Sequence, residues 1–172
     1  GDNYPRRIPA ANDAERLRQF RTGGVQGLAA SGVFGDEVRA QLAALQAADQ
    51  DADPGQVAAH PWLQHYQDAG RGALAAYLGT TNEIDFDEVN GIFAAFKDGA
   101  TTIPLKRMGR TEGELWYDPV DFTGIDVLIV EWTHGNNDLL TGVDIPILLN
   151  STPEETLAHR RSRARDGATD SP

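Results

Sequence analysis

The stretch DVLIVEWTHGNN, residues 126–137, decides the fold class that we expect for this chain. The run from Ile125 to Glu131 is typical of a strand buried on both faces, because it is short, continuous and rich in Val, Ile and Leu. A second run of this kind covers residues 145–150. Parallel pairing of two such strands is implied, and the chain is therefore expected to have an α/β fold with a parallel sheet as its core and helices flanking it.

Apolar residues at helical spacing predict four helices before these strands. Asn12 is expected to cap the first helix and Gly23 to end it. The others are expected over residues 36–48, from about residue 61 to Gly79, and from the DFDE segment to Gly99.

The segments TTIPLKR and GELWYDPV, joined across MGRTE, predict a hairpin after the fourth helix. A last helix begins at Thr152, with Pro153 first in the helix and Glu155 completing a capping box. We expect one domain over residues 1–172. It comprises a helical insertion at residues 12–80 and a strand-containing core at residues 81–172 that ends in an arginine-rich lid helix.

The composition limits the partners that the chain can have. The formal net charge is -11, from 26 acidic and 15 basic residues, which opposes broad binding to nucleic acids or membrane surfaces. The sequence contains no cysteine and no apolar run as long as a membrane span or a signal core. His60 and His65 are five positions apart, off one helical face, so we reject a zinc site. We expect a cytoplasmic protein.

Two residues near the end of the first predicted strand could carry chemistry. Ligands of open α/β sheets bind at the carboxyl ends of strands, where Glu131 could order a magnesium-bound water or hold a substrate hydroxyl. The alternative is a salt-bridged strand end. His134 could bond a substrate hydroxyl, and the alternative is an exposed structural histidine.

Charged residues near the two termini form two further groups. Asp2, in GDNYPRR together with Tyr4, Arg6 and Arg7, could accept a proton from a substrate hydroxyl. The other group either covers a solvated helix face or forms a mobile clamp for transferring phosphates. Its members are Arg160, Arg161, Arg163 and Arg165.

The order of GDNYP, a helical insertion, EIDFDEVNGIFAAFKDG, TIPLKRMGR, DVLIVEW and DIPILLNSTPEETLAHRRSRARDG resembles the uridine kinase and phosphoribulokinase group of P-loop kinases. The resemblance implies that Asp2 is the catalytic base or orienter, with Tyr4 one residue earlier than in that group's D-x-x-Y segment. It also implies that Asp85 and Asp87 place the substrate, that Glu131 lies near magnesium, and that the four C-terminal arginines form a phosphate-binding lid. Trp132 stands where the group has glycine.

The phosphate-binding motif G-x-x-x-x-G-K-[ST] is absent from the 172 residues. In the kinase group this loop precedes the D-x-x-Y segment, so we expect it before Gly1. By that expectation the P-loop kinase-like fold is incomplete at its N-terminus by roughly 30 to 40 residues, the length of one strand-loop-helix-strand unit.

The resemblance implies a phosphotransferase that uses ATP and Mg²⁺ and moves the γ-phosphate to a hydroxyl of a small metabolite. Lys106, Arg107 and Arg110 are expected to line the acceptor side or, alternatively, to hold the hairpin to neighbouring carboxylates. The acceptor stays open among nucleosides, sugars, adenylylsulfate and other hydroxyl compounds. Expected partners are a small-molecule substrate and a nucleotide, and homo-oligomerisation is left open.

Two other hypotheses remain. The second is a non-catalytic kinase-like module that binds a metabolite or a partner and lacks the phosphate loop. The third, an unrelated all-helical acidic adaptor, leaves the two buried-type strands unexplained, and we rank it last.

Overall fold

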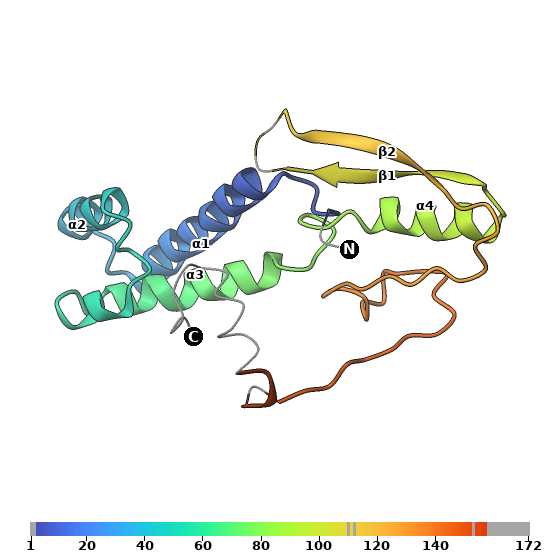
Figure 1. Cartoon of the computed structure of the whole chain (residues 1–172). Helices are drawn as coiled ribbons and strands as arrows, with labels where there is room; N and C mark the ends of the chain where they lie inside the picture. Colours follow the sequence, from blue (N-terminus) through green and yellow to red (C-terminus); the bar gives the residue numbers. More distant parts are fainter. Residues whose placement is uncertain (1–2, 110, 112, 153, 158–172) are drawn as a thin grey trace. The chain divides into compact units, whose positions relative to one another are not determined.

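The computed structural model describes residues 3–109, 111, 113–152 and 154–157. Contacts divide the chain into two compact units, residues 1–142 and residues 143–172, and each is described by itself (Figure 1). The first unit contains both helices and strands, which confirms the mixed α/β class. None of the helices in the described part of the chain is long and apolar enough to cross a membrane.

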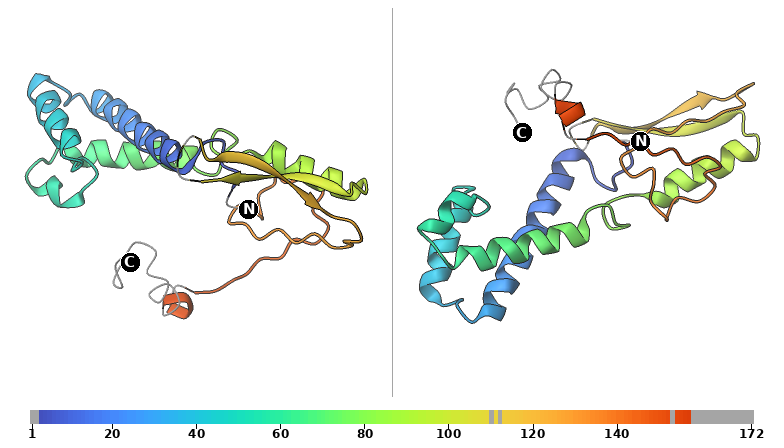
Figure 2. Two further views of the ribbon diagram at one scale, coloured as in Figure 1. Left: turned by 45° about the horizontal axis from the view of Figure 1, so that its top comes forward. Right: turned by 90° about the horizontal axis from the view of Figure 1, so that it is seen from below.

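Helices α1 (Pro9–Ser31) and α3 (Leu63–Tyr77) lie side by side in both views of Figure 2. They approach closely because α1 presents glycines to α3: a Cβ at Gly24 would lie 2.5 Å from the ring of Tyr66. The prediction that the first helix starts at an Asn12 cap and ends at Gly23 is wrong. Pro9 occupies its first turn, where the missing N–H costs nothing, and Gly32 ends it in the left-handed conformation at φ 75°.

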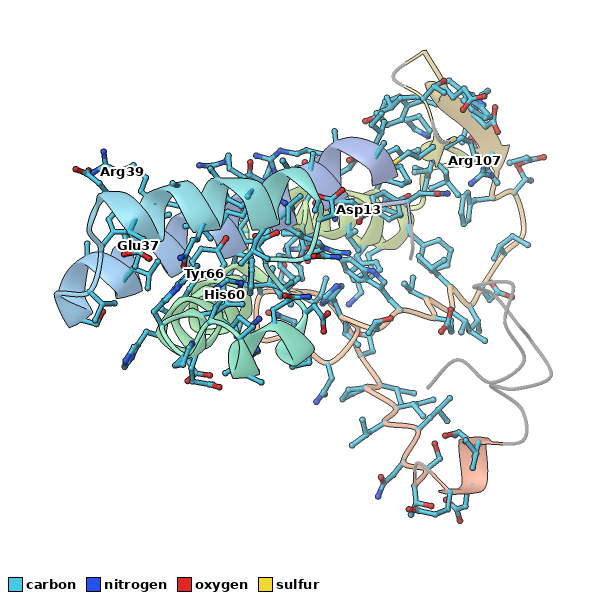
Figure 3. All side chains as sticks on the ribbon, turned by 90° about the vertical axis from the view of Figure 1, so that its left-hand side faces the viewer. Asp13, Glu37, Arg39, His60, Tyr66 and Arg107 are labelled. Atoms are coloured by element: carbon cyan, nitrogen blue, oxygen red, sulfur yellow. The ribbon has the colours of Figure 1, made fainter. Side chains whose placement is uncertain are left out.

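Helix α2 (Asp36–Ala47) completes a small helical core and confirms the second predicted helix. Phe20, Leu28, Leu42, Leu45 and Leu63 are buried there with Tyr66, one of the side chains that Figure 3 labels.

The acidic segment after α2 forms a 3₁₀ helix, η1 (Pro54–Ala58), and carries a buried carboxylate. Asp51 is 1% exposed and accepts hydrogen bonds from Arg21 at 2.9 and 3.1 Å and from the Tyr66 hydroxyl at 2.7 Å. A buried charge is stable only when it is paired and hydrogen-bonded, so this network fixes the segment to α1 and α3.

Helix α4 (Phe86–Lys97) packs on a two-stranded antiparallel sheet, as Figure 1 shows. Strands β1 (Thr102–Met108) and β2 (Leu115–Asp121) pair from Thr102 opposite Asp121 to Met108 opposite Leu115. Phe86, Val89 and Ile103 are buried between helix and sheet. The predicted third and fourth helices and the hairpin are therefore confirmed.

The two apolar runs differ from the expectation. Among the described residues neither 125–131 nor 145–150 forms a strand, and the sheet consists of β1 and β2. Ile129 is 84% exposed and Leu149 is 85% exposed. A strand requires a neighbour that pairs with its N–H and C=O groups, and neither run has such a neighbour in the described residues. The structure thus does not contain the predicted parallel sheet.

The second unit contains one helical turn over residues 154–157. The Thr152 N–H donates to Glu155 Oε2 at 2.8 Å, and the Glu155 N–H donates to Thr152 Oγ1 at 3.2 Å. These reciprocal bonds are the predicted capping box. Pro153 lies outside the described residues.

Candidate functional site

A polar cleft of about 700 Å³ lies in the first unit. Its walls come from the N-terminal segment, α1, the end of α3, the following turn and the start of α4. The volume falls within the range of roughly 300–1,000 Å³ that is usual for small-molecule pockets. The lining residues are Arg6, Arg7, Glu15, Arg18, Gln19, Tyr77, Thr81, Asn82 and Asp87.

Main-chain hydrogen bonds attach the N-terminal segment to the turn between α3 and α4. The Asp85 N–H donates to the Tyr4 carbonyl at 2.9 Å, and the Arg6 N–H donates to the Glu83 carbonyl at 2.8 Å. Pro5 and Ile84 form an isolated antiparallel bridge between these two bonds. Side chains that are 75 or more positions apart in the sequence therefore meet at the cleft.

The carboxylate of Glu83 holds this turn to α1. It is 1% exposed and accepts bonds from the Gly79 N–H at 2.7 Å, from Arg16 at 2.6 and 2.7 Å, and from Asn12 Nδ2 at 3.2 Å. Burial acts to raise the pKa of Glu83, but the hydrogen bonds from Gly79, Arg16 and Asn12 outweigh it and lower that pKa. Glu83 is therefore an ionised anchor behind the cleft.

Arg7 brings a positive charge into the cleft that no carboxylate compensates. Its Nη1 donates to the Tyr77 hydroxyl at 3.1 Å and to the Asn82 carbonyl at 3.0 Å, and both acceptors are neutral. Within the described residues, no carboxylate forms an ion pair with Arg7. Burial raises the pKa of Tyr77, which keeps its hydroxyl protonated. An oriented, uncompensated guanidinium favours a polar or anionic ligand.

The predicted site residues Arg6, Asp85 and Asp87 lie at or beside this cleft. Arg6 donates to Asp85 Oδ2 at 3.1 Å, and its Nε bonds to the Thr81 carbonyl. The other oxygen of Asp85 caps α4 by accepting from the Glu88 N–H at 3.2 Å. Asp87 is exposed and lines the cleft directly.

The two described cations of the hairpin hold neighbouring carboxylates, which was the alternative for them. Lys106 is 5% exposed, and its Nζ lies 3.0 Å from Glu88 Oε2. Arg107, labelled on the hairpin in Figure 3, lies with its Nε 3.0 Å from Asp118 Oδ2. Neither residue lines the cleft.

Tyr4 and His134 meet in a ring cluster around Trp132. The ring centroids of Trp132 lie 6.4 Å from Tyr4, 5.6 Å from Phe86 and 5.3 Å from His134. Burial is the first cause that raises the pKa of Tyr4, followed by the charge of Glu88. The cluster anchors the loop after the first apolar run. Glu131, just before it, is exposed and ends no strand.

The remaining predicted site residues lie outside the described part of the chain. They are Asp2, Arg110, Arg160, Arg161, Arg163 and Arg165.

The described residues do not by themselves fit ATP with Mg²⁺. The sequence contains no phosphate loop. Within residues 3–109, 111, 113–152 and 154–157, no group of three His, Asp or Glu side chains could hold a metal ion. What these residues can do is bind and orient an acceptor, so no chemical step is derived through ATP or the metal.

The sequence analysis did not assign to the cleft the residues that α1 and α3 contribute. Glu15 was interpreted as part of a cap and Tyr77 as a core side chain, but both line the cleft. One signal was available, because Glu15, Arg18 and Gln19 have the i, i+3, i+4 spacing that places them on one helix face. No local signal indicated that this face would meet Arg7.

The comparisons identify a relative with two activities. The chain is 38% identical over all of its 172 residues to the bifunctional alpha-galactosidase/sucrose kinase AgaSK of Mediterraneibacter gnavus. It spans 14% of that protein's length. No protein-family model matches the chain, and neither does any solved structure.

Proposed function

We propose that this chain is part of an ATP-dependent sugar kinase and that its polar cleft binds the acceptor sugar. The observation that carries the proposal is the 38% identity, along the whole chain, to a protein named as a sucrose kinase. That protein has two activities, and the kinase-like order of motifs in this sequence favours the kinase activity over the galactosidase activity.

The lining of the cleft is suited to a ligand rich in hydroxyl groups. Arg7 and Arg18 provide N–H donors, and Glu15 and Asp87 provide acceptors. A hydroxyl both donates and accepts, so mixed walls of this kind bind a sugar better than a wall of one type. The uncompensated charge of Arg7 would also balance negative charge near the acceptor as a phosphoryl group arrives.

The finer features of the kinase group belong to the same proposal. The apolar runs 125–131 and 145–150 would form strands of a parallel sheet in one domain, because pairing satisfies their backbone groups. Asp2 would orient the acceptor hydroxyl, and Glu131 would lie near Mg²⁺. The reaction would take place in the cytoplasm, with ATP and the sugar as partners.

The test uses the whole natural protein in which these residues occur. ADP release is measured with ATP, Mg²⁺ and either sucrose, fructose or uridine, and hydrolysis of p-nitrophenyl α-galactoside is measured in parallel. We expect sucrose-dependent ADP release. Uridine as the preferred acceptor would refute the sugar assignment, and galactoside hydrolysis without ADP release would refute the kinase.

Arg7→Ala tests the cleft itself. A charge-assisted hydrogen bond contributes about 1.5–3 kcal/mol, so kcat/KM for sucrose should fall about 10- to 100-fold. The matched control is Arg71→Ala, which removes an exposed arginine on α3 that pairs with Asp68. An effect of Arg7→Ala no larger than that of the control would move the acceptor site elsewhere. Sucrose binding with no ATP turnover would support the second candidate, a metabolite-binding module.

A further inference from the structure

Three side chains on α1 form a single hydrogen-bonded unit on one wall of the cleft. The Arg18 guanidinium bonds Glu15 through Nε at 2.8 Å and through Nη2 at 2.6 Å, and Gln19 Nε2 donates to Glu15 Oε1 at 2.7 Å. All three residues line the cleft. We call this group, Glu15, Arg18 and Gln19, the α1 triad.

Helix α3 carries a similar group that lines no part of the cleft, which allows a direct comparison. Gln64 donates to Asp68 at 2.9 Å, and Arg71 donates to it at 2.6 Å. The side chain of Asp68 is 60% exposed, as expected for a solvated helix face, whereas that of Glu15 is 15% exposed. Burial at the cleft wall is therefore particular to Glu15 and is not a consequence of the hydrogen-bonding pattern.

The triad retains free capacity for hydrogen bonding. A guanidinium has five N–H donors, and in the described part of the chain the Arg18 guanidinium bonds only to Glu15. A carboxylate can accept about four hydrogen bonds, and Glu15 accepts three from this triad. Donors and an acceptor in a fixed arrangement match adjacent hydroxyl groups of a sugar ring.

Bonds from Arg18 and Gln19 lower the pKa of Glu15 to about 2. Glu15 is consequently an ionised acceptor at any working pH. Its role is binding rather than proton transfer, because a group that stays ionised does not exchange protons near neutrality.

The position of the triad suggests which part of a ligand it meets. Arg7 and Asp87 come from the N-terminal segment and the start of α4, whereas the triad comes from α1, within the helical insertion. A cleft of about 700 Å³ is well above the lower end of the small-molecule range, which leaves room for two linked rings.

Building on the proposed function, we propose that the α1 triad is a subsite for the second, non-reacting ring of a disaccharide acceptor. The triad then selects disaccharides over monosaccharides. Its contacts are made equally in the ground state and in the transition state, so they act on KM and leave kcat unchanged.

The experiment compares Glu15→Gln with the matched Asp68→Asn in the whole natural protein. The sucrose dissociation constant is measured by calorimetry, and KM and kcat are measured by ADP release, with sucrose and with fructose. Glu15→Gln should weaken sucrose binding and raise its KM at least tenfold, with kcat and the affinity for fructose unchanged. Asp68→Asn should change none of these quantities more than twofold.

Several results would overturn the subsite. A sucrose affinity within twofold of the unsubstituted protein would exclude contact between Glu15 and the sugar, and equal losses for sucrose and fructose would exclude the second ring. Gln19→Ala, which keeps the Glu15–Arg18 pair, provides a second variant if Glu15→Gln melts at a lower temperature. If the unsubstituted protein neither binds nor phosphorylates sucrose, the proposed function fails together with the subsite. Normal phosphorylation by both variants removes the subsite alone.

Discussion

Replacing Glu83 with glutamine should destabilise the first unit substantially, because this carboxylate joins α1 to the turn that carries the cleft. The substitution keeps the shape but removes the charge that Arg16 and the Gly79 N–H bind. Removing one partner of a fully buried ion pair costs about 3–5 kcal/mol. The side chain of Arg16 is 41% exposed, so water replaces part of the lost interaction, and we expect a loss of about 2–3 kcal/mol.

The pH dependence of this loss has a definite sign. Hydrogen bonds lower the pKa of Glu83 in the folded chain below the unfolded value of 4.5. The stability that it contributes is therefore fully present above pH 4.5 and is lost as the pH falls through the folded pKa. The difference between the original chain and Glu83→Gln should accordingly shrink at acidic pH.

Urea denaturation, followed by circular dichroism at 222 nm at several pH values, measures both effects. The control is Glu37→Gln, which removes an exposed carboxylate that bonds only Gln41 among the described residues and should change stability by less than about 0.5 kcal/mol. A loss for Glu83→Gln as small as that of the control would refute the reasoning. A loss that persists unchanged at low pH would show that its cause is not the ionised carboxylate.

Two further predictions concern the helical core. Asp51→Ala removes a buried carboxylate and should lower the free energy of unfolding by about 3 kcal/mol, whereas Asp49→Ala, at an 84% exposed side chain, should change it by less than about 0.5 kcal/mol in the same urea titration. Gly24→Ala would press a Cβ against the buried ring of Tyr66 and should cost about 1–3 kcal/mol, but Gly72→Ala meets no atom within 4 Å and should raise the midpoint of thermal unfolding, because alanine favours a helix by about 1 kcal/mol.

The sequence predicted best those elements whose contacts are local. The hairpin has its partner strand a few residues away, and α2, α3 and α4 each show an apolar stripe of their own. The prediction for α1 failed at Gly23 because the sequence does not show that α3 packs against these glycines. The apolar runs 125–131 and 145–150 depend on distant partners, and their composition alone could not guarantee pairing.

The cleft was harder to predict than the fold for a related reason. Lys106 and Arg107 stood in a basic run that suggested an acceptor site, but Glu88 and Asp118 pair with them. Charge in a sequence shows that a cation is present and does not show whether a carboxylate already neutralises it. Arg7 had the same appearance in the sequence as Arg6 beside it. Only the structure shows that Arg6 pairs with Asp85 and that Arg7 bonds to neutral oxygens.

This difference separates the residues that stabilise the cleft from those that are available to a ligand. Glu83 donates no bond to the cleft and is fully used by its neighbours, so its loss should lower stability first and binding only as a consequence. Arg7 leaves no carboxylate unpaired when it is removed, so Arg7→Ala should weaken acceptor binding with little change in the free energy of unfolding. A variant of Arg7 that unfolds as readily as Glu83→Gln would mean that Arg7 is a structural tie between the N-terminal segment and α3, and the acceptor would then have to be held by other residues.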